Sequence, residues 1–283
     1  MGAVSVVNAI ASGRGATVAV RLRTRARVEV EQSPGEWDVA LNGRFVGSTL
    51  AQETVAKTML AIGLDPSRHS GSVETTTEAP VGVGLKTSSS SSVAISMATL
   101  AAFGRQRYAP HDILGYSVSA SLASGVSATG ALDDAASCLM GGANFTDNLS
   151  RKVLSSQRLG KPLTVLIRVP QGRSRRKKVS LRSVRTFSKE ADEIFRLGKR
   201  GKVWNAMTLN GFLYCSIYGY DPLPATQALE AGALGAGLSG TGPAVAAVFG
   251  EQGEPDRLEE AWSDGGANVI VTQTTDEGAT FER

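Results

Sequence analysis

The glycine- and serine-rich segment at residues 80–94, PVGVGLKTSSSSSVA, constrains the fold more than any other stretch of the chain. A β-like run at residues 72–79 precedes it, and an apolar helical pattern begins near Val93. Gly82 and Gly84 lack a Cβ, so the backbone there can adopt positive φ and let a ligand approach closely. The first turn of a helix presents unpaired N–H groups and the positive end of its dipole. A strand, a glycine loop and a helix N-terminus in this order predict a phosphate-binding site.

A flexible linker is the alternative interpretation of five consecutive serines. Against it, Val93, Met97 and Leu100 follow the i, i+4, i+7 spacing of one helix face, and a linker seldom leads straight into a helix. The segment is also not a P-loop, because that motif requires Gly directly before its Lys, whereas Leu85 precedes Lys86 here.

Two further stretches carry groups suited to chemistry. Residues 130–142, GALDDAASCLMGG, place Asp133 and Asp134 in the first turn of a predicted helix. A carboxylate there is stabilised by the helix dipole and stays ionised unless it is desolvated. The alternative is that the two aspartates only cap the helix. Residues 235–242 repeat the glycine-loop pattern before an apolar run, and a tight turn between two strands is the alternative there.

Together these motifs resemble those of the GHMP kinases, the superfamily named after galactokinase, homoserine kinase, mevalonate kinase and phosphomevalonate kinase. The segment GLKTSS at residues 84–89 is similar to the second motif, in the form of the archaeal-type shikimate kinase branch. Residues 130–142 resemble the segment with the catalytic aspartate, and residues 237–243, GLSGTGP, resemble the third motif. NGFLY at residues 210–214 and GYDP at residues 219–222 precede that motif. The resemblance covers nearly the whole chain, with its motifs in the expected order.

The resemblance implies an ATP-dependent kinase that uses Mg²⁺. Asp133 would accept or orient the proton of the attacking hydroxyl, Asp134 would be a cap or a supporting group, and Ser88 would bind the metal. The implied nucleotide-binding residues are Pro80, Val81, Gly82, Val83, Gly84, Leu85, Lys86, Thr87, Ser88, Ser89 and Ser90. The implied substrate-binding residues are Arg14, Ser239, Gly240, Thr241 and Gly242. The guanidinium of Arg14 offers a planar fork of donors to a carboxylate or phosphate, and a solvated turn arginine is the alternative.

The chain departs from the related mevalonate-type kinases in its acidic residues. Those kinases place a glutamate, a magnesium ligand, about three helical turns before the aspartate, but residues 113–132 contain no acidic residue here. Magnesium would then be held by phosphate oxygens, water and Ser88, or Asp134 would substitute. Such a site is acceptable because Mg²⁺ commonly keeps several waters. The acidic first motif of the sugar kinases is also missing, which argues against a sugar substrate.

The alternation of strands and helices along the chain predicts the α/β or α+β class. The resemblance implies two domains. Residues 1–155 would form the N-terminal ATP-binding domain with the glycine loop and Asp133, and residues 156–283 a ferredoxin-like domain with the third motif. Asn42 and Gly43 between two β-like runs predict a type I′ hairpin.

Composition narrows the possible partners. The formal net charge of +4 over 283 residues suits anionic small molecules. No apolar run approaches 18 residues, so no membrane span is expected, and the basic run at 173–178 lacks the interleaved aromatics of a nucleic-acid site. Cys138 and Cys215 lie in helical patterns and are expected to be buried and reduced, as in a cytoplasmic protein. The sequence predicts no oligomeric state.

Shikimate is the acceptor that the resemblance implies, with shikimate 3-phosphate and ADP as products. Another kinase of the superfamily, such as a homoserine kinase, is one alternative, because the glycine loops would be shared. A nucleotide-binding regulatory protein without turnover is the other, and the missing glutamate favours it.

Overall fold

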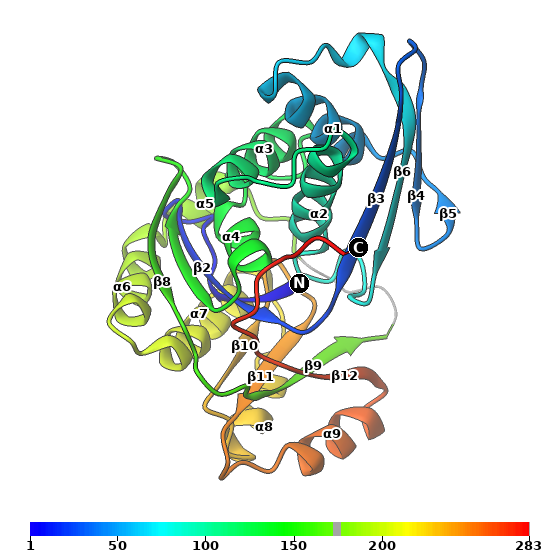
Figure 1. Cartoon of the computed structure of the whole chain (residues 1–283). Coiled ribbons are helices and arrows are strands. Elements are labelled where there is room, and N and C mark those ends of the chain that lie inside the picture. Colours follow the sequence, from blue (N-terminus) through cyan, green and yellow to red (C-terminus); the bar gives the residue numbers. More distant parts are fainter. Residues whose placement is uncertain (172–176, 283) are drawn as a thin grey trace.

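The computed structural model describes residues 1–171 and 177–282, which contain three four-stranded sheets and their covering helices (Figure 1). The strands are β1 (Gly2–Val7), β2 (Arg14–Val20), β3 (Thr24–Glu31), β4 (Trp37–Leu41), β5 (Arg44–Phe45), β6 (Ser70–Thr77), β7 (Ala143–Asp147), β8 (Lys152–Gln157), β9 (Thr164–Pro170), β10 (Gly235–Leu238), β11 (Val245–Phe249) and β12 (Ala267–Gln273). The helices are α1 (Thr49–Ala61), the 3-10 helix η1 (Pro66–Arg68), α2 (Thr87–Ala102), α3 (Pro110–Ala123), α4 (Leu132–Met140), α5 (Leu181–Arg185), α6 (Ser188–Lys199), α7 (Val203–Tyr218), α8 (Leu223–Glu230) and α9 (Pro255–Asp264).

The central sheet, with strand order β1-β2-β7-β8, is antiparallel and lies between α4 on one face and α6 and α7 on the other. Successive side chains of β1 alternate between these faces, as a strand requires. Ala3 packs in the same cluster as Leu139 of α4. Val4 and Val6 pack in the cluster that contains Met207 of α7. All six residues of β1 are buried, so this strand is fixed from both sides.

The second sheet has the order β10-β11-β9-β12 and is antiparallel throughout. Chain order β9, helices, β10, β11, α9, β12 makes it a split βαβ arrangement of the ferredoxin-like kind. Its core includes Phe249 of β11 together with Leu258 and Trp262 of α9. The predicted mixed class with a ferredoxin-like C-terminal part is therefore confirmed.

The outer sheet has the order β3-β6-β4-β5 and buries one face against α1 and α2. Asn42 and Gly43 both have positive φ (48° and 73°), as the predicted type I′ turn between β4 and β5 requires. Among the described residues, no helix is both long enough and apolar enough to cross a bilayer.

The helix after the glycine loop begins at Thr87, six residues before the predicted start near Val93, so the linker interpretation of the serines is wrong. The serine run forms the first turns of α2, and Ser89, Ser90 and Ser92 are buried. Their hydroxyls have partners: Ser90 bonds to Thr24 at 2.9 Å, and Ser92 bonds to Ser117 of α3. Serine is tolerated in a helix when its hydroxyl is satisfied in this way, which an apolar periodicity does not reveal.

The elements that the sequence did not predict include β8 and α5. Part of the basic run lies outside the described residues. β8 is mostly exposed and lacks a clear alternation of polar and apolar residues, and α5 has only five residues. Arg173, Arg175 and Arg176 fall in the undescribed segment. The N–H of Lys177 donates to the carbonyl of Tyr218 at 2.9 Å.

The C-terminal tail, residues 274–282, returns to the N-terminal half of the molecule, and Figure 1 shows the two chain ends near one another. The N–H of Thr275 donates to the carbonyl of Ala19 at 3.1 Å. The N–H of Ala279 donates to that of Leu139 in α4 at 2.8 Å. The expected domain boundary near residue 155 falls within β8, and the division into two domains stays a prediction.

Gly211 of α7 allows the backbones of helix and sheet to touch. A Cβ at this position would lie 2.3 Å from the Cα of Gly237 in β10. We expect Gly211→Ala to lower the free energy of unfolding by about 1–3 kcal/mol, because backbone on both sides must move to make room. The measurement is urea unfolding followed by circular dichroism.

The matched control is Gly115→Ala in α3, where a Cβ meets no atom within 4 Å. Alanine is favoured over glycine inside a helix, so this variant should be more stable by about 0.5–1 kcal/mol. Equal effects of the two substitutions would contradict the packing argument.

Candidate active site

The glycine loop before α2 has the backbone that an anion site requires. Gly82 and Gly84 both have positive φ (78° and 96°), and Lys86 directly before the helix is left-handed. No side chain caps the helix. The N–H groups of its first turn, from Thr87 onward, therefore face outward without an intrahelical acceptor, and the loop presents amides and the positive end of the dipole to the same space.

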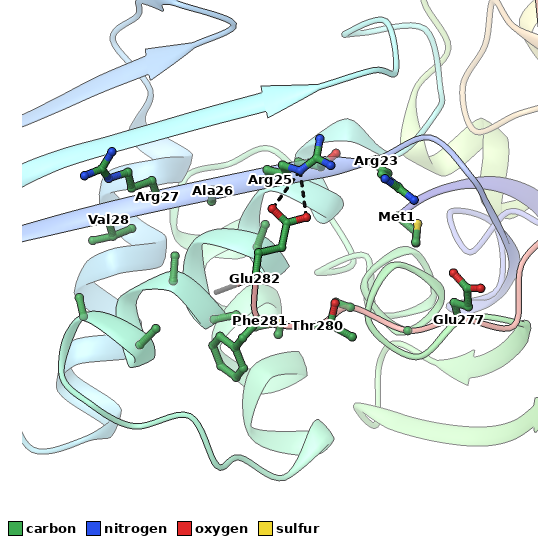
Figure 2. A pocket seen from close by; sticks show the side chains of 18 of the residues that line it. Met1, Arg23, Arg25, Ala26, Arg27, Val28, Glu277, Thr280, Phe281 and Glu282 are labelled. Atoms are coloured by element: carbon green, nitrogen blue, oxygen red, sulfur yellow. Dashed lines mark hydrogen bonds and ion pairs between the residues drawn. The ribbon is translucent and has the colours of Figure 1, made fainter.

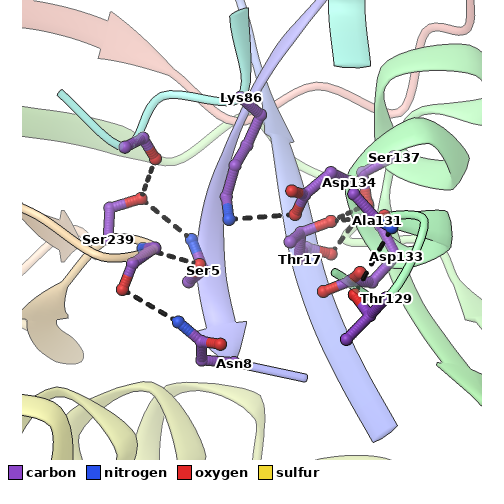
Figure 3. A network of polar contacts seen from close by, with 12 residues as sticks. Ser5, Asn8, Thr17, Lys86, Thr129, Ala131, Asp133, Asp134, Ser137 and Ser239 are labelled. Carbon is purple, nitrogen blue, oxygen red and sulfur yellow. Dashed lines mark hydrogen bonds and ion pairs between the residues drawn. The ribbon is translucent and has the colours of Figure 1, made fainter. Parts of the chain in front are cut away.

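The loop of the third motif, which contains Ser239 and Gly240, lies directly against the glycine loop before α2 (Figure 3). The hydroxyl of Ser239 donates to the carbonyl of Gly84 at 2.8 Å, and a Cβ on Gly84 would lie 2.1 Å from the carbonyl oxygen of Ser239. Ser5 of β1 also binds this loop, because its hydroxyl accepts a hydrogen bond from the N–H of Gly240 at 2.9 Å. The side chain of Asn8 donates to the carbonyl of Gly240 at 2.9 Å. The loop does turn the chain between β10 and β11, but it also forms part of the site.

Asp133 lies in the first turn of α4 and is only 4% exposed. The side-chain amide of Asn148 donates to its Oδ1 at 2.8 Å. A Cβ on Gly15 would lie 2.2 Å from its Oδ2, so this carboxylate fits only because residue 15 is glycine. Burial and the negative charge of Asp134 raise the pKa of Asp133 from an ordinary 3.8 to about 7, against the opposing influence of Lys86 and Asn148.

Asp134 forms an ion pair with Lys86, with 2.9 Å between Oδ1 and Nζ, and both side chains are largely buried. Burial lowers the pKa of Lys86, but Asp134 and Asp133 outweigh it, so the pKa is raised and the ammonium stays charged. The position before α4 belongs to Ala131, which is left-handed. Neither aspartate is the N-cap residue, so the interpretation that they only cap the helix is wrong.

Both loops and the start of α4 line one cavity of about 390 Å³. Of the residues predicted for the site, those that line it are Gly82, Gly84, Lys86, Thr87, Ser88, Ser89, Asp133, Gly240 and Thr241. The predicted residues that belong to the same loops but do not line it are Pro80, Val81, Val83, Leu85, Ser90, Ser239 and Gly242. Leu85, for example, is 1% exposed and packs in the main core.

Arg14, which was predicted to bind the substrate, does not line this cavity. It begins β2, and its guanidinium faces Asp147 at 4.0 Å and Asp192 at 3.7 Å, outside the residues that line the cavity. Its two carboxylate neighbours would have to share it with any bound acid. The substrate-binding role of Arg14 stays a prediction.

The cavity also contains residues that the sequence did not single out. Asn8, Ala9 and Ile10 follow β1, and residues 126–129 precede α4. Asn148, which holds Asp133, follows β7. Asn8 comes directly after a buried strand, but no spacing in the sequence connects it with the glycine loops, so only the fold reveals its place.

Within residues 1–171 and 177–282, no cluster of three or more His, Cys, Asp or Glu side chains could hold a metal ion. Side-chain oxygens that line the cavity beside the glycine loop include those of Ser88 and Asp134. This donor set fits Mg²⁺ only in a site where phosphate oxygens and water supply most ligands. The single hydroxyl of Ser88 and a carboxylate already paired with Lys86 would form no cage on their own.

Comparison with known proteins agrees with this geometry. A family model described as the GHMP kinases N terminal domain matches residues 44–142, which contain the glycine loop and both aspartates. A second model, GHMP kinases C terminal, matches residues 226–268, which contain the third loop.

Similar chains and structures extend the match over the whole length. A protein named shikimate kinase from Methanocella arvoryzae is 36% identical over 98% of this chain and 93% of its own. One from Methanothrix thermoacetophila is 39% identical over 95% and 90%. The mevalonate kinase structure from Methanococcus jannaschii has a TM-score of 0.73 at 15% identity, over 97% of this chain and 96% of that one. The chain therefore belongs to the GHMP kinases, ATP-dependent phosphotransferases, and within them to the family of these archaeal shikimate kinases.

Because the pKa of Asp133 is raised, we expect the free energy of unfolding to depend on pH through this residue. The folded chain keeps a proton on Asp133 at pH values where the unfolded chain has lost it. The contribution of this carboxyl to the free energy of unfolding therefore falls as the pH rises from about 4 to about 7. Asp133→Asn removes this titration. We expect the variant to gain stability relative to the wild type across that window, as measured by urea unfolding at a series of pH values.

Asp112→Asn is the control, because Asp112 also lies in the first turn of a helix but its side chain is 43% exposed. A stability difference for Asp133→Asn that stays constant over the window, or one that Asp112→Asn reproduces, would show that burial does not shift this carboxyl.

Proposed function

We propose that this protein transfers the γ-phosphoryl group of ATP to a hydroxyl of shikimate, giving shikimate 3-phosphate and ADP. One observation carries the proposal: a buried carboxylate, Asp133, shares a 390 Å³ cavity with the amide-rich start of α2. The full-length relatives named shikimate kinase support the acceptor. The homoserine kinase structures resemble this chain at 17–18% identity, which concerns the fold alone.

The triphosphate of ATP would lie on the glycine loop. The N–H groups of the first turn of α2 would donate to phosphate oxygens, and Gly82 and Gly84 would let the backbone come close. Lys86 adds a buried positive charge to the same wall. Phosphoryl transfer depends mainly on alignment and charge neutralisation. The backbone amides, Lys86 and magnesium would together supply the positive field.

Asp133 would act on the attacking hydroxyl. With a pKa of about 7 it can take up a proton near neutral pH, the range in which a general base is most effective. Asn148 holds Oδ1 by a hydrogen bond, so it would orient the carboxylate. The acceptor would lie between Asp133 and the loop at Gly240 and Thr241.

Magnesium would be held by Ser88, phosphate oxygens and water, and Asp134, which lines the same cavity, could supply a carboxylate. When bound, the ion would neutralise charge on the phosphates. We also propose that the glycine loop and Asp133 belong to one domain, residues 1–155, and that the loop of the third motif belongs to a second, residues 156–283.

The two free, buried cysteines fit a cytoplasmic location.

An ATP-consumption assay with shikimate and homoserine side by side tests the function. We expect turnover with shikimate and only background consumption with homoserine. Faster turnover with homoserine would show that homoserine, not shikimate, is the acceptor. Tight ATP binding without turnover on either compound would support a regulatory protein instead.

Asp133→Asn should lower kcat on the order of 10²- to 10⁴-fold, because the amide cannot accept the hydroxyl proton. ATP binding, measured by calorimetry, should remain, since the triphosphate rests on the other wall of the cavity. The control Asp112→Asn should leave kcat unchanged. Near-normal turnover in the Asp133 variant would remove this residue from the role of base.

Ser88→Ala should raise the Mg²⁺ concentration needed for half-maximal activity, because one oxygen ligand is lost. Ser91 lies one turn further along α2 and does not line the cavity, so Ser91→Ala is the matched control. If titration with Mg²⁺ gives the same midpoint for both variants and the wild type, Ser88 is not a ligand.

A further inference from the structure

A second cavity lies on another side of α2 and has no role in the proposed reaction. Its volume is about 780 Å³, larger than the 390 Å³ of the candidate active site, and the two cavities share no lining residue. β3, the second half of α2 and the C-terminal tail at residues 276–282 enclose it (Figure 2).

The floor of this cavity is apolar. Ala94, Met97, Ala98 and Ala101 line it at the i, i+3, i+4, i+7 positions of one face of α2. Phe281 of the tail adds an aromatic ring, which also packs edge-on against Tyr108 with ring centres 5.8 Å apart. An occupant would therefore have to offer an apolar body to this surface.

The rim is rich in arginine, and the carboxylates beside it already have partners. Arg25 pairs with Glu282 at 3.0 Å, as Figure 2 shows, and Glu277 pairs with Arg21 at 3.6 Å. The third carboxylate, Asp276, accepts backbone N–H groups of residues 159 and 160. Glu282 and Glu277 are therefore already paired with arginines, whereas Asp276 keeps its negative charge but is held by backbone N–H groups.

Two guanidinium groups of the rim have no partner among the described residues and can bind an anion. Among the described residues, the side chains of Arg23 and Arg158 have no ion-pair partner or hydrogen-bond acceptor, although both line the cavity. The N-terminal residue Met1 lines it as well, next to Arg23 in Figure 2. Unpaired positive charge therefore stands at the edge of an apolar floor.

We propose that this cavity binds a small organic anion, one that joins a carboxylate, sulfonate or phosphate to a ring or hydrocarbon body. The anionic group would meet Arg23 and Arg158, whose planar forks of donors match such groups. The apolar body would lie on α2 and Phe281. The volume falls within the range of small-molecule sites. The proposal does not depend on the kinase function, because no residue is shared between the two sites.

The probe is 1-anilinonaphthalene-8-sulfonate, a sulfonate on an aromatic body whose fluorescence rises in apolar surroundings. It is titrated into the full chain in the presence of a saturating non-hydrolysable ATP analogue, which occupies the candidate active site. We expect saturable binding of one probe per chain that the analogue does not displace and that weakens as ionic strength rises.

Arg23→Gln should weaken probe binding about threefold to tenfold, because it removes a partly screened charge-assisted contact. Ala101→Trp should abolish it by filling the floor. Arg44→Gln is the matched control, since Arg44 is exposed on β5, in the sheet that contains β3, and lines neither cavity. Near-UV circular dichroism shows whether each variant is natively folded.

Equal affinity of the wild type and the Arg23→Gln variant for the probe would overturn the proposal, and so would undiminished probe binding by a natively folded Ala101→Trp variant. If Ala101→Trp does not fold, Arg23→Gln decides alone, because the substituted side chain is at the surface.

Discussion

The constraint on which the site depends is the burial of two carboxylates beside one ammonium. Asp133 and Asp134 follow one another at the start of α4, and Lys86 pairs with only the second of them. Charges removed from water are tolerated when they are paired or neutralised. The unpaired carboxyl therefore holds its proton to about pH 7, which makes it a group that exchanges protons in the range where a kinase works.

Strand β1 fixes the parts of this site relative to one another. Ser5 of this strand and Asn8, which follows it, form hydrogen bonds with Gly240 in the loop of the third motif. Ser239 of that loop in turn forms a hydrogen bond with Gly84 in the glycine loop before α2. The backbone N–H of Asn8 in turn donates to the side chain of Asn210 in α7 at 2.9 Å. Segments more than 200 residues apart in sequence are thus joined by hydrogen bonds buried from solvent, which keep a cradle rigid without help from a ligand.

Local sequence was enough for the features that depend on backbone chemistry. Gly82, Gly84 and the aspartates at the start of a helix were predicted because positive φ and helix termini leave a direct pattern in the sequence. Contacts between distant segments leave no such pattern. Asn148 supports Asp133 from the end of β7, and Arg14 faces Asp147 and Asp192, arrangements that only the central sheet creates.

A crystal structure with a non-hydrolysable ATP analogue and shikimate tests most directly whether the start of α2 and Asp133 form the active site. We expect phosphate oxygens within hydrogen-bond distance of the N–H groups at the start of α2. We also expect a shikimate hydroxyl beside Asp133, directed at the terminal phosphate. A nucleotide bound away from this loop, or a shikimate ring out of reach of Asp133, would contradict this assignment.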